Sequence, residues 1–338
     1  MNQETLKQFR DTLTQHRDSL FAWYQSDIAD KQVHLGGAAL DEVLEVIAKL
    51  DEALKRIDTG EFGRCIECAD GSDVELERLE LDFTTCVCIS HYSEEQVRAL
   101  ERDLELAAKV QQQLLPRDMP VLEGAQISAH TRPAAIVGGD YFDFFRWKSG
   151  AQGVVIADVM GKGLAASMLM SNLQASLRIL GPEYENPQEL ALRLNELFRF
   201  NLKLLQFISL ALVNVDIKTR TVQYCNAGHH PPLLWKPGSA TVCWLNPTGP
   251  AIGLMPEPPF RSEILEFEPG DVLLLYTDGL IEARDPRGAE FGEERLVEFI
   301  RAHHEESADA LLTGLREAVE NFAGKRLQDD VTLVILKF

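Results

Sequence analysis

Gly153-Val-Val-Ile-Ala-Asp-Val-Met-Gly-Lys-Gly163 is the stretch from which the fold can be worked out. An apolar, β-branched run ends at the carboxylate of Asp158, and a glycine-framed turn and a helix-forming segment, 164–180, follow it. Strand interiors rarely end in aspartate, because burying an unpaired carboxylate is costly. A cation beside the strand end would remove that cost, whereas an ordinary capped strand end would need none. This stretch alone fits both interpretations.

The composition restricts the classes of protein that the chain can represent. It has 338 residues, 45% of them hydrophobic, which is enough for two domains with cores. The formal charge of −20 argues against a nucleic-acid surface, which needs clustered Lys and Arg. No apolar run approaches a membrane span, and the N-terminus does not resemble a signal peptide. Four of the six cysteines crowd between Cys65 and Cys88, unlike a secreted disulfide framework. We therefore expect a cytoplasmic protein that binds neither nucleic acid nor membrane.

Three further aspartate positions repeat the pattern of a carboxylate at a strand end. Asp140 follows a glycine pair, Asp278 follows the apolar run Leu274-Leu-Tyr-Thr, and Asp329-Asp330 opens the last apolar segment. Any one of these fits a turn or a cap, but four together favour a cation. Oxygen ligands select Mg²⁺ or Mn²⁺, and no His/Cys set here favours zinc. Two ions about 3.5–4 Å apart would activate water and hold a phosphoryl group for in-line attack.

The region after Pro116 predicts an α+β fold. Short turns between neighbouring strands favour antiparallel hairpins, and grouped helices fit layers better than a doubly wound parallel sheet. The expected strands are 126–132, 141–147, 154–158, 208–217, 221–226, 262–267, 272–276 and 331–338. The expected long helices are 164–180, 187–205, 292–303 and 307–323.

Five motifs in this region carry a family resemblance. They are Val137-Gly-Gly-Asp-Tyr-Phe-Asp143, Ile156-Ala-Asp-Val-Met-Gly-Lys-Gly163, Cys225-Asn-Ala-Gly-His-His-Pro-Pro-Leu-Leu234, Tyr276-Thr-Asp-Gly-Leu280 and Asp329-Asp-Val-Thr332. In this order they resemble the PPM-type serine/threonine phosphatases, in the bacterial branch typified by the sporulation stage II E and RsbU regulators of sigma-factor partner switching. The resemblance covers roughly residues 105–338.

The resemblance implies an antiparallel β-sandwich flanked by helices, with a two-metal site at one edge. It implies that Asp158 bridges both metals near the Val159 carbonyl, and that Asp278 and Asp329 complete one metal. It places Asp140 beside the second metal, and Gly161 and Gly163 in the turn. We expect Asp330 to be structural, while Asn226 and His229 receive no chemical role from the sequence.

The N-terminal third predicts a helical hairpin and a zinc site. Apolar stripes indicate helices over 3–28 and 38–58, which can bury each other as an antiparallel pair, alone or within a dimer. Cys65-Ile-Glu-Cys68 and Cys88-Ile-Ser-His91, separated by 19 residues, suit a tetrahedral zinc ion with three thiolates and one imidazole. We interpret Cys86 as a spare or packing thiol. The alternative is a set of reduced cysteines that bind no metal.

The residues around these knuckles resemble the zinc finger of the DksA/TraR family over roughly 50–92. The matching elements are Ala53-Leu-Lys-Arg-Ile-Asp-Thr-Gly60, Phe62-Gly63, the two knuckles and Glu77-Arg-Leu79. The sequence departs from that family by having His91 where a fourth cysteine is usual, and its helical hairpin is short. We therefore transfer the fold and the structural zinc, and not the RNA polymerase partner.

A helix over 93–115 connects the two parts. Ser93 is a good N-cap and Pro116 closes the segment. Apolar positions recur about every 3.5 residues at Val97, Leu100, Leu104, Ala107, Gln111 and Leu114, which indicates a coiled-coil seam of some three heptads. An ordinary amphipathic helix packed on its own domain is the alternative.

The sequence thus predicts a regulatory module over 1–92, a linker helix over 93–116 and a phosphatase domain over 117–338. The expected reaction is attack of metal-activated water on phosphoserine or phosphothreonine. The resemblance implies a STAS-type anti-sigma-factor antagonist as substrate, and we expect a homodimer paired through the N-terminal module and the linker. The alternatives are a catalytically silent binding scaffold and a transcription-machinery adaptor acting through the zinc module.

Overall fold

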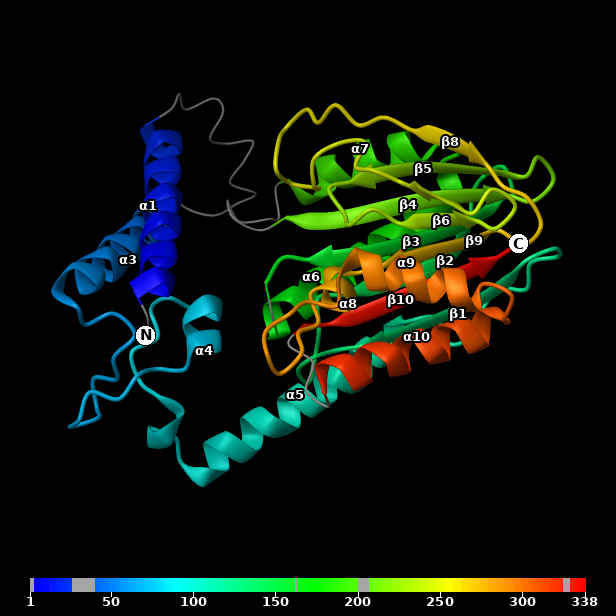
Figure 1. Ribbon diagram of the computed structural model, residues 1–338. Helices are drawn as coiled ribbons and strands as arrows, with labels where there is room; N and C mark the ends of the chain where they lie inside the picture. Colours follow the sequence, from blue (N-terminus) through cyan, green and yellow to red (C-terminus); the bar gives the residue numbers. More distant parts are fainter. Residues whose placement is uncertain (1–2, 26–39, 162, 200–206, 325–328) are drawn as a thin grey trace. The chain divides into compact units, whose positions relative to one another are not determined.

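The computed structural model describes residues 3–25, 40–161, 163–199, 207–324 and 329–338. These residues divide into two compact units (Figure 1), with the boundary between Asp103 and Leu104. Each unit has its own buried core. Within the described residues, no helix combines the length and apolarity that crossing a membrane requires.

The first unit contains the predicted helical hairpin. Helices α1 (Gln3–Gln25) and α3 (Leu40–Thr59) run antiparallel, since Arg10 pairs with Asp58 at 2.7 Å and Arg17 with Asp51 at 3.5 Å. The predicted helix residues 26–28 and 38–39 lie outside the described part. The shared core includes Leu13, Leu50, Ala53, Ile57, Phe62, Val74 and Leu79. A short helix α4 (Leu76–Leu81) and the 3-10 turn η1 (Ile89–His91) complete the unit.

The linker helix α5 (Glu94–Leu114) begins with a capping box. The Gln96 amide donates to Ser93 Oγ at 3.2 Å, and the Ser93 amide donates to Gln96 Oε1 at 2.8 Å. Among the predicted seam positions, Leu100 is exposed and Gln111 is buried. A buried polar side chain needs a hydrogen-bond partner. Gln111 has this partner in the backbone of Gly138, in the loop before β2.

The second unit is built on two five-stranded antiparallel sheets, in agreement with the predicted sandwich (Figure 1). One sheet has the order β1-β10-β9-β6-β7 and the other β2-β3-β4-β5-β8. The strands are β1 Gln126–Arg132, β2 Tyr141–Arg146, β3 Gln152–Val159, β4 Ile208–Asp216, β5 Thr221–Ala227, β6 Leu233–Lys236, β7 Thr241–Trp244, β8 Glu263–Glu266, β9 Val272–Tyr276 and β10 Val331–Lys337. Strands β6 and β7 are absent from the sequence prediction.

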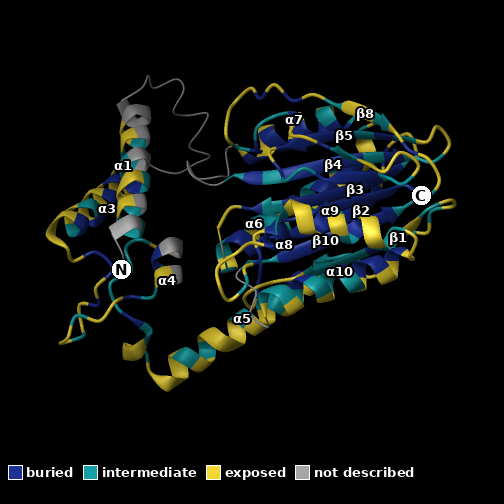
Figure 2. Ribbon diagram, in the orientation of Figure 1, coloured by how far each residue is buried: buried dark blue, intermediate teal, exposed yellow. Residues whose placement is uncertain are grey.

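Helices cover both outer faces of the sandwich. Helices α6 (Gly163–Leu180) and α7 (Pro187–Phe198) contact the β2–β5 sheet, and α9 (Gly292–His303) and α10 (Ala308–Ala323) share a core with β6, β9 and β10. The single-turn helix α8 (Asp278–Ile281) follows β9 directly. The inner strands β3, β4, β9 and β10 are therefore buried between layers, whereas the edge strand β8 is mostly exposed (Figure 2). The predicted helix 187–205 ends at Phe198 in the structure, and residues 200–205 lie outside the described part.

Candidate active site and metal centres

Asp158 lies near the end of β3, opposite Ser209 of β4, and the loop before β2 approaches it closely. A β-carbon at Gly139 would stand only 2.7 Å from the Val159 carbonyl oxygen and 3.5 Å from Asp158 Oδ1. Real β-carbons do not approach a carbonyl that closely, so glycine at 139 is required by the contact. The glycine pair therefore lets the Asp140 loop lie against Asp158 and the Val159 carbonyl.

The Asp140 carboxylate is buried and held by two threonine hydroxyls. Its Oδ2 accepts hydrogen bonds from Thr277 Oγ1 at 2.7 Å and from Thr332 Oγ1 at 2.6 Å. Burial raises the pKa of Asp140 well above its ordinary value, and the negative charge of Asp158 raises it further. With Oδ2 taken by the threonines, Oδ1 becomes the candidate ligand atom. A cation between Asp140 and Asp158 would relieve their repulsion.

The segments that carry Asp278 and Asp329 lie side by side. The Thr277 amide donates to the Thr332 carbonyl at 3.1 Å, and the Thr332 amide donates to Thr277 Oγ1 at 3.0 Å. A β-carbon at Gly279 would overlap the Asp330 carbonyl oxygen and stand 3.4 Å from the carbonyl carbon of Asp329. The two segments are about fifty residues apart in the sequence. Their backbones are thus in contact next to Asp278 and Asp329.

Asp330 has a different role from its neighbour. Its two oxygens accept hydrogen bonds from the backbone amides of Ala134 and Gly139, each at 2.8 Å. Both acceptors therefore shape the loop that leads to Asp140. The geometry makes Asp330 a loop-holding residue and leaves Asp329 as the candidate ligand of the pair.

The turn between β3 and α6 depends on its glycines. Gly161 has φ +109° and Gly163 has φ +68°, a region that side chains with a β-carbon rarely adopt. The Met160 amide donates to the Phe207 carbonyl at 3.0 Å, which ties the turn to the start of β4. These positions shape the turn directly after Asp158 and Val159.

The donor set fits a pair of hard divalent cations. Asp140, Asp158, Asp278, Asp329 and the Val159 carbonyl offer only oxygen atoms, which suit Mg²⁺ or Mn²⁺. The burial of Asp140 beside Asp158 gives the physical need for a cation there. The contacts above join the chain segments that carry the aspartates singled out by the sequence.

Hydrogen bonds of His229 and Asn226 hold the loop after β5 in place. His229 Nε2 donates to the Tyr276 carbonyl at 3.1 Å, so its Nδ1 accepts from Ser209 Oγ at 2.8 Å. Burial lowers the pKa of His229 to about 3, with a smaller contribution from His230, which keeps the ring neutral. Asn226 accepts the His229 amide at 2.8 Å and donates to the Leu245 carbonyl at 2.9 Å. Both residues orient this loop beside β9.

Sequence reasoning missed three residues that support the site. Thr277 and Thr332 hold Asp140, and their positions within the Thr-Asp-Gly and Asp-Asp-Val-Thr motifs were the available signal. Gln111 of α5 binds both backbone groups of Gly138. The sequence did not indicate this role of Gln111, because periodicity predicts which residues share a helix face and not which polar group a residue binds.

The second cluster is the set of cysteine and histidine ligands in the first unit. Cys65, Cys68, Cys88 and His91 bring their ligand atoms within 4.8 Å of one another. Cys68 Sγ lies 3.6 Å from Cys88 Sγ and 3.0 Å from His91 Nε2, distances that a tetrahedral zinc ion can span. The Cys65 amide donates to the Ser72 carbonyl at 2.8 Å, so the chain folds back after Cys68. Cys86 is outside this group of four.

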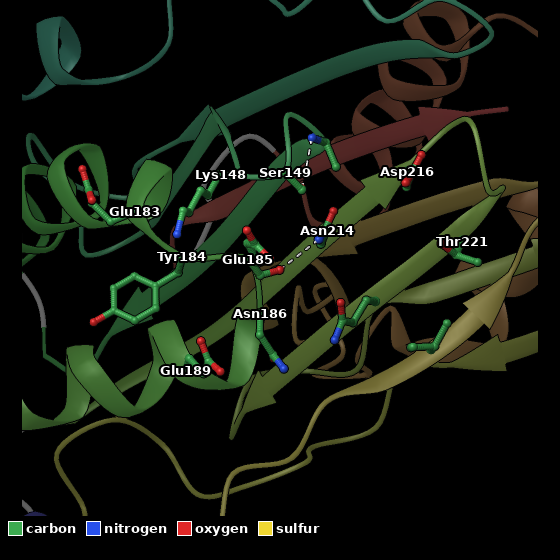
Figure 3. Close-up of a pocket in the computed structure, with 13 residues that line it drawn as sticks. Lys148, Ser149, Glu183, Tyr184, Glu185, Asn186, Glu189, Asn214, Asp216 and Thr221 are labelled. Atoms are coloured by element: carbon green, nitrogen blue, oxygen red, sulfur yellow. Dashed lines mark hydrogen bonds between the residues drawn. The ribbon is translucent and has the colours of Figure 1, made fainter.

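A polar hollow of about 630 Å³ lies elsewhere on the second unit (Figure 3). Lys148, Glu185, Asn214 and Asp216 are among its lining residues. Asn214 and Asp216 stand at the end of β4, whereas Ser209, opposite Asp158, stands at its start. The hollow is therefore at the far end of the sheet from the carboxylates, and we do not assign it to the same site.

The family model described as Stage II sporulation protein E (SpoIIE) matches residues 148–338. The phosphoserine phosphatase RsbU of Bacillus subtilis is 28% identical over 265 residues, covering 76% of this chain and 78% of RsbU. Protein IcfG of Synechocystis is 30% identical over 260 residues, covering 69% of this chain and 41% of IcfG. The chain thus spans well under half the length of IcfG.

Among solved structures, the SiaA-PP2C domain of Pseudomonas aeruginosa superposes with a TM-score of 0.62 at 20% identity. The match covers 71% of this chain and 98% of that domain. At this identity the likeness establishes the fold. The two antiparallel sheets with flanking helices are those of a PP2C-type domain.

Proposed function

The chain belongs to the SpoIIE family, and on that premise we propose that it is a phosphoserine/phosphothreonine protein phosphatase dependent on Mg²⁺ or Mn²⁺. The proposal assigns catalysis to the domain over 117–338. Support comes from RsbU, which is named a phosphoserine phosphatase and aligns over 76% of this chain.

The observation that carries the proposal is the gathering of aspartates around Asp140. One oxygen of Asp140 accepts hydrogen bonds from Thr277, which directly precedes Asp278, and from Thr332, which follows Asp329 by three residues. The same loop packs against Asp158 and the Val159 carbonyl through Gly139. These contacts between the segments that carry the four aspartates support a shared site at one edge of the sandwich.

Each residue has a part in the proposed reaction. Asp158 would be shared by two cations, with the Val159 carbonyl near them. Asp278 and Asp329 would complete one of the cations, and Asp140 would serve the other. Bound there, the two ions would supply activation of a water molecule and polarisation of a phosphoryl oxygen. Thr277 and Thr332 keep Asp140 oriented, and Gly161 and Gly163 keep the turn after Asp158 in shape.

We infer the substrate from the kind of relative that matches. A small phosphorylated STAS-type anti-sigma-factor antagonist fits a member of this family that resembles RsbU. The reaction would return the antagonist to its unphosphorylated form in a partner-switching pathway. The cytoplasmic location expected from the sequence stays a prediction.

The N-terminal module is proposed to be regulatory, with a DksA/TraR-like zinc finger over about 50–92. The four ligands gathered at Cys65–His91 support a structural zinc ion, which stabilises a small domain directly. We propose that two chains pair through this module and the linker over 93–116. The last turn of α5 offers a route to the catalytic domain, because Gln111 binds Gly138 and the Leu114 carbonyl accepts from Gln174 of α6 at 3.4 Å.

The test is phosphate release from a phosphopeptide and from p-nitrophenyl phosphate with and without Mn²⁺. Asp158→Asn is expected to reduce kcat by several orders of magnitude, because it removes the shared ligand. Asp309→Asn, an exposed aspartate in the first turn of α10, is the matched control and should retain full activity. Equal turnover by wild type and Asp158→Asn would reject the mechanism. Deleting residues 1–92 tests regulation separately, through activity and oligomeric state.

A further inference from the structure

A buried histidine that the proposed reaction leaves unused joins the two sheets of the second unit. His229 is 2% exposed, and its ring has a hydrogen-bond partner in each sheet. Nδ1 accepts from Ser209 Oγ of β4 at 2.8 Å, and Nε2 donates to the carbonyl of Tyr276, the last residue of β9, at 3.1 Å. Strand β4 belongs to the sheet β2-β3-β4-β5-β8 and β9 to the sheet β1-β10-β9-β6-β7. The imidazole therefore bridges the two sheets.

Each end of this bridge lies beside a segment that carries a proposed metal ligand. Ser209 is directly opposite Asp158 in the β3–β4 pairing, and the side chains of opposite residues lie on the same face of a sheet. Both residues are half-buried, whereas their neighbours along the two strands are buried: Ala157, Val159, Ile208 and Leu210. Tyr276 stands two residues before Asp278. The ring thus connects the strand end of Asp158 to the strand end that leads to Asp278.

The ring is held in one orientation and one protonation form. A carbonyl oxygen can only accept, so Nε2 carries the hydrogen, and Nδ1 is the acceptor of a neutral ring. Burial lowers the pKa of His229 to about 3, which keeps the ring neutral. Asn226 fixes the backbone, since its side chain accepts from the His229 amide at 2.8 Å and donates to the His229 carbonyl at 3.1 Å. A ring held in this way makes a directional contact with each sheet.

A histidine that only stabilises the core is the alternative role. Buried polar groups have hydrogen-bond partners in either case, so the bonds alone do not separate the two roles. The location of the partners does separate them. Both stand next to chain segments that would share a pair of cations, and ligands of such a pair must keep their spacing closely. A group that fixes the distance between these segments would affect metal binding beyond any effect on stability.

We propose that His229 is a positioning residue that sets the spacing between Asp158 and Asp278, and that it acts on Asp158 through Ser209. The inference rests on the proposed two-metal function. Without the bridge, each sheet keeps its own strand pairings, but the imidazole no longer ties the Asp158 strand to the end of β9. Ions that need ligands from both sheets then bind more weakly, by about tenfold or more, as loss of a hydrogen bond that orients a ligand typically does.

Binding of Mn²⁺ by Ser209→Ala gives the main test. The full-length protein, with its Cys₃His cluster filled by Zn²⁺, is titrated with Mn²⁺ in equilibrium dialysis. Ser209→Ala is expected to weaken Mn²⁺ binding by about tenfold or more. Ser209→Thr keeps the hydroxyl and should bind as the wild type does. Ser262→Ala is the matched control, because Ser262 Oγ donates at 2.8 Å to Asn186, which lines the hollow at the far end of the sheet.

Thermal unfolding without added Mn²⁺ separates positioning from stability. Ser209→Ala and Ser262→Ala should lose comparable stability, since each removes one part-buried hydroxyl hydrogen bond. Only Ser209→Ala should need about tenfold more Mn²⁺ for half-maximal phosphate release from p-nitrophenyl phosphate. Its kcat at saturating Mn²⁺ should match the wild type, because the proposed reaction gives Ser209 no contact with the substrate. A reduced kcat at saturating metal would overturn the positioning role.

Two further outcomes would also overturn it: wild-type Mn²⁺ affinity in Ser209→Ala, or equal weakening of Mn²⁺ binding in Ser262→Ala. The proposed function can fail separately. A wild type that binds Mn²⁺ and releases no phosphate, alongside weakened Mn²⁺ binding in Ser209→Ala, would refute the phosphatase and leave the positioning role standing. Phosphate release by the wild type, with unchanged Mn²⁺ affinity in Ser209→Ala, would do the reverse.

Discussion

Gln111 of the linker helix and Gly138 of the Asp140 loop are joined by two hydrogen bonds. Gln111 Nε2 donates to the Gly138 carbonyl at 2.6 Å, and the Gly138 amide donates to Gln111 Oε1 at 3.1 Å. A buried side-chain amide thus satisfies both backbone groups of a residue two positions before Asp140. This pairing makes α5 part of the wall that shapes the candidate active site.

Gln111→Ala is expected to lower metal affinity and activity together, by about tenfold or more, because groups that orient ligands usually have effects of that size. The change leaves two buried backbone groups of Gly138 without their partner. Metal-dependent phosphate release and Mn²⁺ binding give the measurement. Gln113→Ala, at an exposed position of the same helix, is the control. Identical behaviour of the two variants would mean that the pairing does not position Asp140.

Gly279→Ala is expected to destabilise the protein and to abolish activity. The added β-carbon would overlap the backbone carbonyl of Asp330, and neither backbone segment can move without displacing Asp278 or Asp329. Overpacking of this kind costs about 1–3 kcal/mol and occasionally more. Thermal unfolding and phosphate release provide the readouts. Gly238→Ala has no atom within 4 Å of its new β-carbon, so wild-type behaviour is expected there.

Removal of zinc should change the number of reactive thiols. With zinc bound, a thiol reagent at pH 8 should modify Cys86 and Cys243, which are half-buried. Cys225 is protected, because burial raises the pKa of its thiol to about 11. A strong chelator should release the three further thiols of the zinc ligands and loosen the first unit.

Cys86→Ser provides the control for this thiol count. It should remove one fast-reacting thiol and leave zinc content at one ion per chain, whereas Cys88→Ser should lose the ion. Zinc content that stays the same in Cys88→Ser would refute the ligand set.

His130 of β1 should make the second unit sensitive to acid. Burial lowers the pKa of His130 below its ordinary value of 6.5, and the positive charge of Arg316 adds to the effect. As pH falls below 6.5 the unfolded chain takes up this proton before the folded one, so the free energy of unfolding decreases. His130→Leu should reduce this acid dependence. Urea unfolding of both proteins at pH 8 and pH 5 makes the comparison, and parallel losses of stability would contradict it.

The chain order of the carboxylates and most of the sandwich follow from local pattern. Apolar runs that end in Asp158 and Asp278 indicate strand ends. These signals can be identified from the sequence because strand periodicity and turn residues are local properties. Strands β6 and β7, of four residues each, were not predicted, and β6 directly follows Pro231-Pro232, residues typical of loops. Such short runs become strands only by pairing with each other and, for β6, with β9.

The sequence by itself determined which residue types could hold metal: aspartates at strand ends, and cysteines with a histidine at knuckle spacing. Only the tertiary structure decided how they are used. Asp140 is held by Thr277 and Thr332, partners 137 and 192 residues away, and Asp330 uses both oxygens to hold a loop. Gln111 fits a heptad pattern and binds Gly138 instead. Hydrogen bonds between distant segments depend on chain packing, which has no local signature in the sequence.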